Sequence, residues 1–356
     1  MIEGISPDLE RILNAGNQAP SGENCQPWHF VVRGQTIEVH LLPERDQSAY
    51  SWGQRASYLA NGAAIENIVI AASAEHYRAE VKYFPNADDP QHVVTISLIK
   101  DPRLQIDPLA GFIDARISNR KAYQKDSLTP EERMALIRSG GGEESITLID
   151  AVDALKRLGR VGATNEEVML ANRSLHNFFF SHVSWTKEED EEKKIGFYIK
   201  TLELPPPAQA MFKAFRHWKV MRLFNKIGFN RAVAKQNAAT NASAAAMGAF
   251  MINRTEPLDF VKVGRAVERL WLTATSLGLS FQPLTGVLFF KLKIAGGEVG
   301  AFSSQEQKLI MSAYAEASQI LKAGERHIAF IFRVGRGDTP SAHAVRFPLE
   351  DVVTVK

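Results

Sequence analysis

The chain has 356 residues, of which 45% are apolar and 23% are charged, and its formal net charge is +2. This composition is typical of a globular protein, and the balanced charge argues against a nucleic-acid-binding protein, which would carry a clustered basic excess. No apolar run approaches the ~20 residues of a membrane span, and the segment after Met1 does not resemble a secretory leader. The single cysteine, Cys25, excludes an intrachain disulfide. We therefore expect a cytoplasmic protein.

Helix and strand signals alternate along the first part of the chain. Ser6, Pro7 and Asp8 predict a helix start, because a hydroxyl N-cap, a proline at the first helical position and an acid near the positive end of the dipole all favour one. Segments rich in β-branched and aromatic residues predict strands at 28–32, 36–42, 80–84 and 93–99. The nearly apolar stretch 62–72 predicts a buried helix.

The same signals return in the second part of the chain. Thr129, Pro130 and Glu131 repeat the helix-start pattern, and strands are predicted at 145–149, 250–253 and 327–334. A second nearly apolar helix is predicted at 264–274. Strands mixed with long helices in each part indicate an α+β fold, with buried helices between two sheets.

The two apolar helices resemble each other. The segments GAAIENIVIAA at 62–72 and GRAVERLWLTA at 264–274 match in their Gly, Ala, Glu and aliphatic positions, at an offset of 264 − 62 = 202. We interpret the match as an internal repeat, although two unrelated core helices with small residues would look similar. The helix starts at Ser6 and Thr129 are 123 apart, so the second half carries 202 − 123 = 79 extra residues, for which 163–243 is a candidate insertion or lid.

The candidate insertion contains an aromatic and basic stretch at 212–235. A basic amphipathic helix there would allow contact with an anionic membrane surface. The alternative, which we favour, is a lid helix packed on the body of the protein with a solvated basic edge. We therefore expect no membrane partner beyond such a surface contact.

Several common catalytic signatures are missing from the sequence. There is no phosphate-binding GxxxxGK[ST] loop and no GxSxG elbow. The nine histidines are scattered, so we expect no metal site. Cys25 lacks a basic neighbour in sequence and is interpreted as a small buried residue rather than a nucleophile.

The most informative segment is APSGENCQPWHFVV at 19–32. It resembles the Ala-Pro-Ser-x-x-Asn-x-Gln-Pro-Trp signature of the nitroreductase family of FMN-dependent proteins; a proline-rich loop between a helix and a strand is the plain alternative. In the family this loop reaches across a dimer interface to the flavin of the other subunit. The resemblance implies flavin contacts from Pro20, Ser21, Gly22 and Asn24, whose short side chains and backbone N–H groups can bond a flavin edge.

The segment RISNRKAY at 116–123 resembles the Arg-x-Ser-x-Arg motif of the same family, although a solvated basic face would explain it equally well. The resemblance implies that Arg116 binds the phosphate and that Ser118 bonds ribityl or phosphate oxygens. It implies that Arg120 lies near the flavin edge that becomes negative on reduction.

Two further segments extend the resemblance. The segment QPLTG at 282–286 is similar to the family's Pro-x-Glu-Gly turn over the flavin ring, with threonine in place of glutamate, and an ordinary turn is the alternative. It implies cofactor contacts from Pro283, Leu284, Thr285 and Gly286, with the backbone N–H of Thr285 toward flavin N5. The family often ends on an arginine that binds phosphate, and Arg346 matches it here.

Each half lacks the motifs that the other half supplies. The chain therefore resembles a nitroreductase dimer fused into one polypeptide, of the Acg type, with halves at 1–110 and 111–356, one composite FMN site and the lid at 163–243. The fusion would suit a monomer, and a homodimer stays open.

The resemblance implies an oxidoreductase that takes hydride from NAD(P)H and reduces a nitroaromatic, a quinone or another electron-poor small molecule, with Arg120 and Thr285 as catalytic groups. The alternative is an FMN storage or sequestration protein in which the lid blocks hydride donors.

Overall fold

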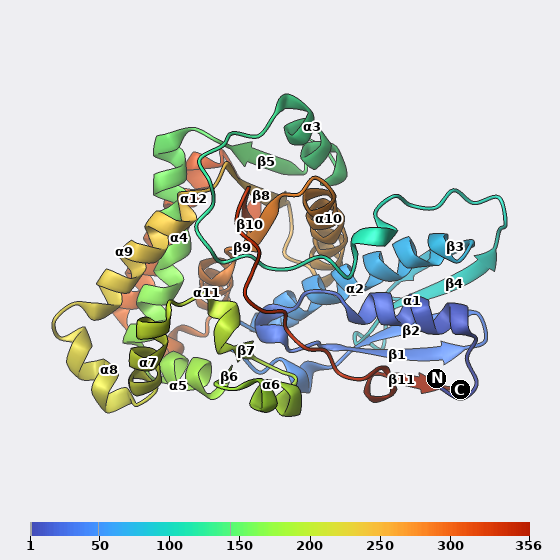
Figure 1. Ribbon diagram of the computed structural model, residues 1–356, viewed down its shortest axis with the longest axis horizontal. Coiled ribbons are helices and arrows are strands. Elements are labelled where there is room, and N and C mark those ends of the chain that lie inside the picture. The colour runs from blue at the N-terminus through green and yellow to red at the C-terminus, as the bar shows by residue number, and fades with distance from the viewer. Residues whose placement is uncertain (1, 49, 143) are drawn as a thin grey trace.

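The computed structural model describes residues 2–48, 50–142 and 144–356. Helices and strands occur in both halves of the chain, and a group of helices projects on one side (Figure 1). The helices are α1 (Pro7–Asn17), α2 (Arg55–Ala74), α3 (Pro130–Ser139), α4 (Val152–Ala171), α5 (Arg173–Ser181), α6 (Lys187–Lys193), α7 (Pro206–Phe215), α8 (Trp218–Asn225), α9 (Phe229–Asn241), α10 (Pro257–Ser276), α11 (Gly286–Ala295) and α12 (Ser304–Ile320). The strands are β1 (Trp28–Arg33), β2 (Thr36–Leu41), β3 (Tyr77–Tyr83), β4 (His92–Lys100), β5 (Ile146–Ile149), β6 (Val183–Ser184), β7 (Phe197–Tyr198), β8 (Ala246–Ile252), β9 (Ser280–Pro283), β10 (His327–Gly335) and β11 (Val353–Val355).

Two main sheets carry the fold. The first has five strands in the order β11-β1-β2-β4-β3, and the second has four in the order β5-β8-β10-β9. All neighbours are antiparallel except β11, which runs parallel to β1 with Phe30 beside Val353. The end of the chain therefore returns to the sheet of the first half, and both termini lie at the same end of the molecule (Figure 1).

One continuous core joins the two sheets through α2 and α10. It contains Trp28 and Phe30 from the first sheet, Phe250 and Phe332 from the second, and the buried faces of both helices. The predicted α+β class, with buried helices between two sheets, is confirmed.

The two resembling helices cross at their corresponding glycines. A Cβ on Gly62 would lie 2.1 Å from the carbonyl oxygen of Val261, and a Cβ on Gly264 would lie 1.9 Å from that of Leu59. Because 261 − 59 and 264 − 62 both equal 202, the contact is reciprocal. Reciprocal contacts of this kind are expected at a two-fold interface.

Most sequence-predicted element positions are confirmed. Ser6 accepts a hydrogen bond from the N–H of Leu9, and Thr129 forms a capping box with Glu132. The seven predicted strands all occur, although β8 begins at Ala246, four residues before the predicted start. Strands β6, β7, β9 and β11 were not predicted from the sequence; all four are short, and β11 was missed although its three residues are β-branched.

The predicted insertion is mostly helical and also contains the short parallel pair of β6 and β7. Residue 163 falls inside α4, so the helical layer begins at Val152. The long helices α4 and α9 pack closely, and a Cβ on Gly159 would lie 2.6 Å from the carbonyl oxygen of Ala238. We call the segment 172–228, which includes α5 to α8 and links these two helices, the lid segment. Among the described residues, no helix is long and apolar enough to cross a membrane.

Candidate functional site

A cavity of about 400 Å³ lies where the two halves and the lid segment meet. Its volume falls within the range of small-molecule sites. The first half supplies the loop at 20–23 and the start of α2, the second half supplies residues 118–120 and the turn at 282–286, and the lid segment supplies an aromatic wall. The aromatic residues of that wall are Phe179, Phe197 and Phe212.

Nine of the twelve sequence-predicted site residues line this cavity, and three do not. The nine come from three segments that are far apart in sequence: Pro20, Ser21, Gly22, Ser118, Arg120, Pro283, Leu284, Thr285 and Gly286. The three outside the lining are Asn24, Arg116 and Arg346. The cavity thus brings together the motif segments of opposite halves, while the roles of individual residues stay predictions.

The loop after α1 is held in an unusual backbone conformation. Glu23, Asn24 and Gln26 have φ angles of 51°, 53° and 49°, a region that residues other than glycine seldom adopt. The hydroxyl of Ser21 accepts a hydrogen bond from the N–H of Gln26 at 2.9 Å. The Asn24 amide donates to the carbonyls of Lys194 and Val345, so this side chain ties the loop to the lid segment and to the C-terminal segment.

Arg116 is buried in an ion pair with Glu268 of α10 at 3.1 Å, and its guanidinium lies 4.7 Å from the ring centre of Trp271. Burial raises the pKa of Glu268 to about 7, and the charge of Arg116 opposes this shift. Glu268 lies 268 − 66 = 202 residues after Glu66, which is the offset between the two resembling helices. Glu66 instead pairs with Arg265 and Arg269, so the two carboxylates have different partners.

Arg346 binds the backbone at the end of α1 and the loop that follows it. Its guanidinium donates to the carbonyls of Asn17, Gln18 and Ala19 and, at 2.8 Å, to the amide oxygen of Asn24. Burial, with the nearby charge of Arg116, lowers the pKa of Arg346 to about 9. Arg116 also donates to the Gln18 carbonyl at 2.7 Å, so two buried arginines share one stretch of backbone directly before Pro20.

Arg120 is the single cation among the described residues that line the cavity. It donates to the carbonyl of Thr201 at 3.0 Å and lies 5.6 Å from the ring centre of Phe197, both in the lid segment. Burial lowers the pKa of Arg120, and the Glu203 carboxylate opposes that shift. The arginine therefore faces the cavity and contacts its cover at the same time.

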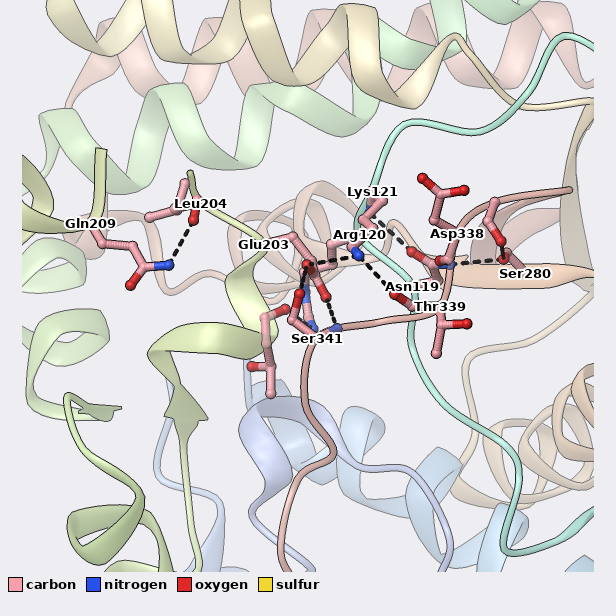
Figure 2. Close-up of polar contacts among 12 residues, drawn as sticks. Asn119, Arg120, Lys121, Glu203, Leu204, Gln209, Ser280, Asp338, Thr339 and Ser341 are labelled. Carbon is pink, nitrogen blue, oxygen red and sulfur yellow. Dashed lines mark hydrogen bonds and ion pairs between the residues drawn. The ribbon is translucent and has the colours of Figure 1, made fainter. Parts of the chain in front are cut away.

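Glu203 fastens the lid segment to the C-terminal segment beside Arg120 (Figure 2). Its carboxylate accepts hydrogen bonds from the N–H and the hydroxyl of Ser341, each at 2.7 Å, and lies 3.8 Å from the ammonium of Lys121. Next to this contact, Asn119 donates to Ser280 and to the carbonyl of Asp338. These bonds hold the arginine motif, β9 and the C-terminal segment in one arrangement.

The turn at 282–286 leads from β9 into α11. Gly286 is the first residue of α11, where free backbone N–H groups carry partial positive charge. A Cβ on Gly286 would lie 2.1 Å from the side-chain oxygen of Asn165 on α4. A side chain at this position would therefore displace Asn165 from its present place beside the turn.

A buried arginine that was not predicted from the sequence connects the motif segments. Arg333 on β10 is fully buried and donates to Gln282 and to the carbonyls of Thr240 and Lys121, each at 2.7 Å. Its guanidinium lies 4.0 Å from the ring centre of Tyr123. The available signal was one arginine within the otherwise apolar strand HIAFIFRVG.

Acidic residues in the lining were also missed. Burial, with the nearby charge of Asp46, raises the pKa of Glu23 to about 8. Burial also raises the pKa of Glu166, whose carboxylate accepts from Asn165 at 3.2 Å. Carboxyl groups with raised pKa values in a cavity are candidate proton donors. Glu23 belongs to the loop after α1 and Glu166 belongs to α4, outside the motif segments.

Comparison with known sequences confirms the resemblance to nitroreductase-like proteins. No family model matches the chain. It is 22% identical over 339 residues to an uncharacterised protein of Mycobacterium tuberculosis, a match that covers 94% of this chain and 46% of that protein, so the chain spans about half the length of this relative. It is 25% identical over 288 residues to a putative NAD(P)H nitroreductase of the same organism, a match that covers 78% of this chain and 77% of that protein. A shorter match, 33% identical over 79 residues, covers 22% of this chain and 24% of the putative NAD(P)H nitroreductase acg.

Solved structures give a weaker likeness. An FMN-bound nitroreductase from Bacteroides fragilis has 13% identity and a TM-score of 0.35, covering 68% of this chain and 96% of that one. The FMN-dependent nitroreductase NfnB from Mycobacterium smegmatis, in complex with NADPH, has 15% identity and a TM-score of 0.36. The match covers 67% of this chain and 93% of that one. Because both scores are below 0.5, this likeness adds no evidence about the site.

Proposed function

We propose that the cavity binds FMN and that the protein is an oxidoreductase using NAD(P)H as electron donor and a nitroaromatic, a quinone or another electron-poor small molecule as acceptor. One observation supports this most: the three segments that resemble flavin-binding motifs come from opposite halves of the chain and line one cavity. The relatives named as putative NAD(P)H nitroreductases point in the same direction.

The lining suits a flat aromatic ring with polar edges. Trp271, Phe289 and Phe330 supply apolar surface, while Ser21, Ser118 and Arg120 supply hydrogen-bond donors. The backbone N–H groups at the start of α11 add donors that no side-chain substitution removes. These groups fit an isoalloxazine ring and its ribityl chain.

A bound flavin would supply hydride and electron transfer, and the chain would supply position and charge. Arg120 would stabilise negative charge on the ring, because a buried, fixed cation acts more strongly than one in water. The backbone N–H of Thr285 would bond a ring nitrogen, and the lid segment would cover the bound ring. The phosphate contacts of Arg116 and Arg346 and the flavin contact of Asn24 stay predictions. Here the three side chains bond to neighbouring protein groups.

We further propose that residues 1–110 and 111–356 are two halves related by an internal two-fold, with one composite site. The reciprocal contact of Gly62 and Gly264 supports this division. So does β11, which joins a sheet otherwise built from the first half. A monomer or a homodimer, the cytoplasmic location and the absence of a nucleic-acid partner stay predictions.

The visible absorption spectrum of the purified chain, followed by anaerobic addition of NADPH, tests the proposal. We expect one FMN per chain and rapid bleaching. A colourless protein that FMN does not reconstitute would overturn the cofactor assignment.

The second candidate function is FMN storage or sequestration. It is favoured by the number of bonds that hold the cover closed: Asn24 and Gln26 both donate to the Lys194 carbonyl, the N–H of Gly196 donates to the Glu23 carbonyl, and Glu203 binds Ser341. Steady turnover of menadione with NADPH would exclude this candidate. A yellow protein that NADPH does not bleach would favour it.

A further inference from the structure

We propose that the tip of the lid segment, formed by α8 and the turn that follows it, is a docking surface for an anionic phospholipid bilayer. We call this surface the lid tip and define it by Lys219, Arg222, Leu223, Lys226 and Ile227. It lies at the end of the molecule opposite the chain termini (Figure 1). The inference is independent of the flavin proposal, since vesicle binding can be measured whether or not a cofactor is bound.

Charge is strongly segregated in this region. Residues 205–241 contain seven lysines and arginines and no aspartate or glutamate. The whole chain has a formal net charge of +2, so the remainder carries 2 − 7 = −5. Among the described residues, Arg231 is the one cation of the seven with an ion-pair partner, Glu167 at 3.7 Å. The excess charge is therefore available to an external anionic surface.

The cations share one face of α8 with exposed aliphatic side chains. Lys219, Arg222, Leu223 and Lys226 follow the spacing i, i+3, i+4 and i+7, which places them on one side of a helix, and all four are exposed. The opposite side contains Met221, which is fully buried. Helix packing thus fixes which face points outward.

Two aliphatic side chains protrude where the cations cluster. Leu223 is 62% exposed, and Ile227, at the apex of the turn between α8 and α9, is 82% exposed. The turn is closed by the N–H of Ile227 donating to the Phe224 carbonyl and the N–H of Gly228 donating to the Asn225 carbonyl. Gly228 adopts a φ of +85°, which lets α9 begin at once and leaves Ile227 projecting.

This combination fits a bilayer better than a nucleic acid. Cations near an anionic membrane are attracted to its surface, and aliphatic side chains gain by burial in the acyl region. The phosphates of a nucleic acid would pair with the cations but would leave Leu223 and Ile227 in water. The occupant that satisfies both features is an anionic lipid surface.

Co-sedimentation of the full chain with vesicles tests this proposal. We expect binding to vesicles of equal parts phosphatidylglycerol and phosphatidylcholine at low salt, little binding to pure phosphatidylcholine, and weakening as salt rises. Joint replacement Lys219→Gln, Arg222→Gln and Lys226→Gln should lower the partition coefficient roughly 100-fold, since each cation near such a surface contributes a factor of about five. The pair Leu223→Ser and Ile227→Ser should also weaken binding.

The matched control replaces Lys125, Lys308 and Lys322 by glutamine, which changes the net charge equally at exposed positions outside the lid tip. All the replaced side chains are exposed, so we expect every variant to fold. An unchanged circular dichroism spectrum verifies this. The proposal is overturned by absence of binding to phosphatidylglycerol vesicles, or by an equal loss in the control. It is also overturned if duplex DNA binding requires the lid-tip cations while the serine pair has no effect on vesicle binding.

Discussion

Substituting Gly264 by alanine tests whether the α2–α10 crossing organises the molecule. A Cβ at this position would lie 1.9 Å from the Leu59 carbonyl oxygen and 3.0 Å from the Leu59 Cα. Both obstacles are backbone atoms, so the helices must separate, whereas a side chain could have rotated away. Overpacking of this kind costs about 3 kcal/mol, and replacing a helical glycine by alanine returns up to about 1 kcal/mol. We expect a net loss of about 2 kcal/mol in the free energy of unfolding.

Denaturant unfolding followed by circular dichroism measures this loss, and Gly111→Ala is the control. No atom lies within 4 Å of a Cβ built on Gly111, and its φ is not positive. Gly62→Ala should cost a similar amount, because its Cβ would lie 2.1 Å from the Val261 carbonyl oxygen. The double variant should lose less free energy of unfolding than the two single variants together, since the first substitution already separates the helices. Full stability of Gly264→Ala would refute the close crossing.

Three further predictions concern the cavity and its cover. Arg120→Ala should weaken FMN binding about 10- to 100-fold, because a charge-assisted hydrogen bond is lost; quenching of flavin fluorescence measures this, with Lys125→Ala as control. Glu203→Ala should speed FMN release several-fold while leaving the fold intact, since the carboxylate loses both bonds to Ser341; stopped-flow exchange of bound FMN measures the rate. Glu23→Gln should become progressively more stable than the wild type as pH rises from about 4.5 to 8, the pH range between its unfolded and folded pKa values.

The stability of the wild type falls with pH because the folded and unfolded chains bind different numbers of protons at Glu23. A carboxyl whose folded pKa is raised holds its proton in the native state after the unfolded chain has lost it, so stability falls as pH rises through this range. Thermal unfolding of both proteins across the range measures the difference. If the stabilities of the two proteins change with pH in parallel, Glu23 is not buried as described. For Glu203→Ala, an unchanged FMN release rate would show that Ser341 does not hold the cover.

Local signals in the sequence located most elements and the segments that line the cavity. The caps at Ser6 and Thr129 and the alternating strands depend on neighbouring residues, so they are readable from short windows. The short segment 280–283 is a strand because β10 pairs with it. The same holds for 353–355, which is extended because β1 lies beside it. Such pairings are decided by partners distant in sequence.

The sequence by itself determined the two apolar helices, the glycines at their repeat positions and the order of the motif segments. Only the tertiary structure decided that Gly62 and Gly264 pack on each other's helix, that Arg333 links the motif segments, and that Arg116 pairs with Glu268. Propensity and capping act over a few residues, whereas burial and ion pairing depend on which distant segments meet. The composite cavity belongs to the second group, because no single stretch of this chain contains it.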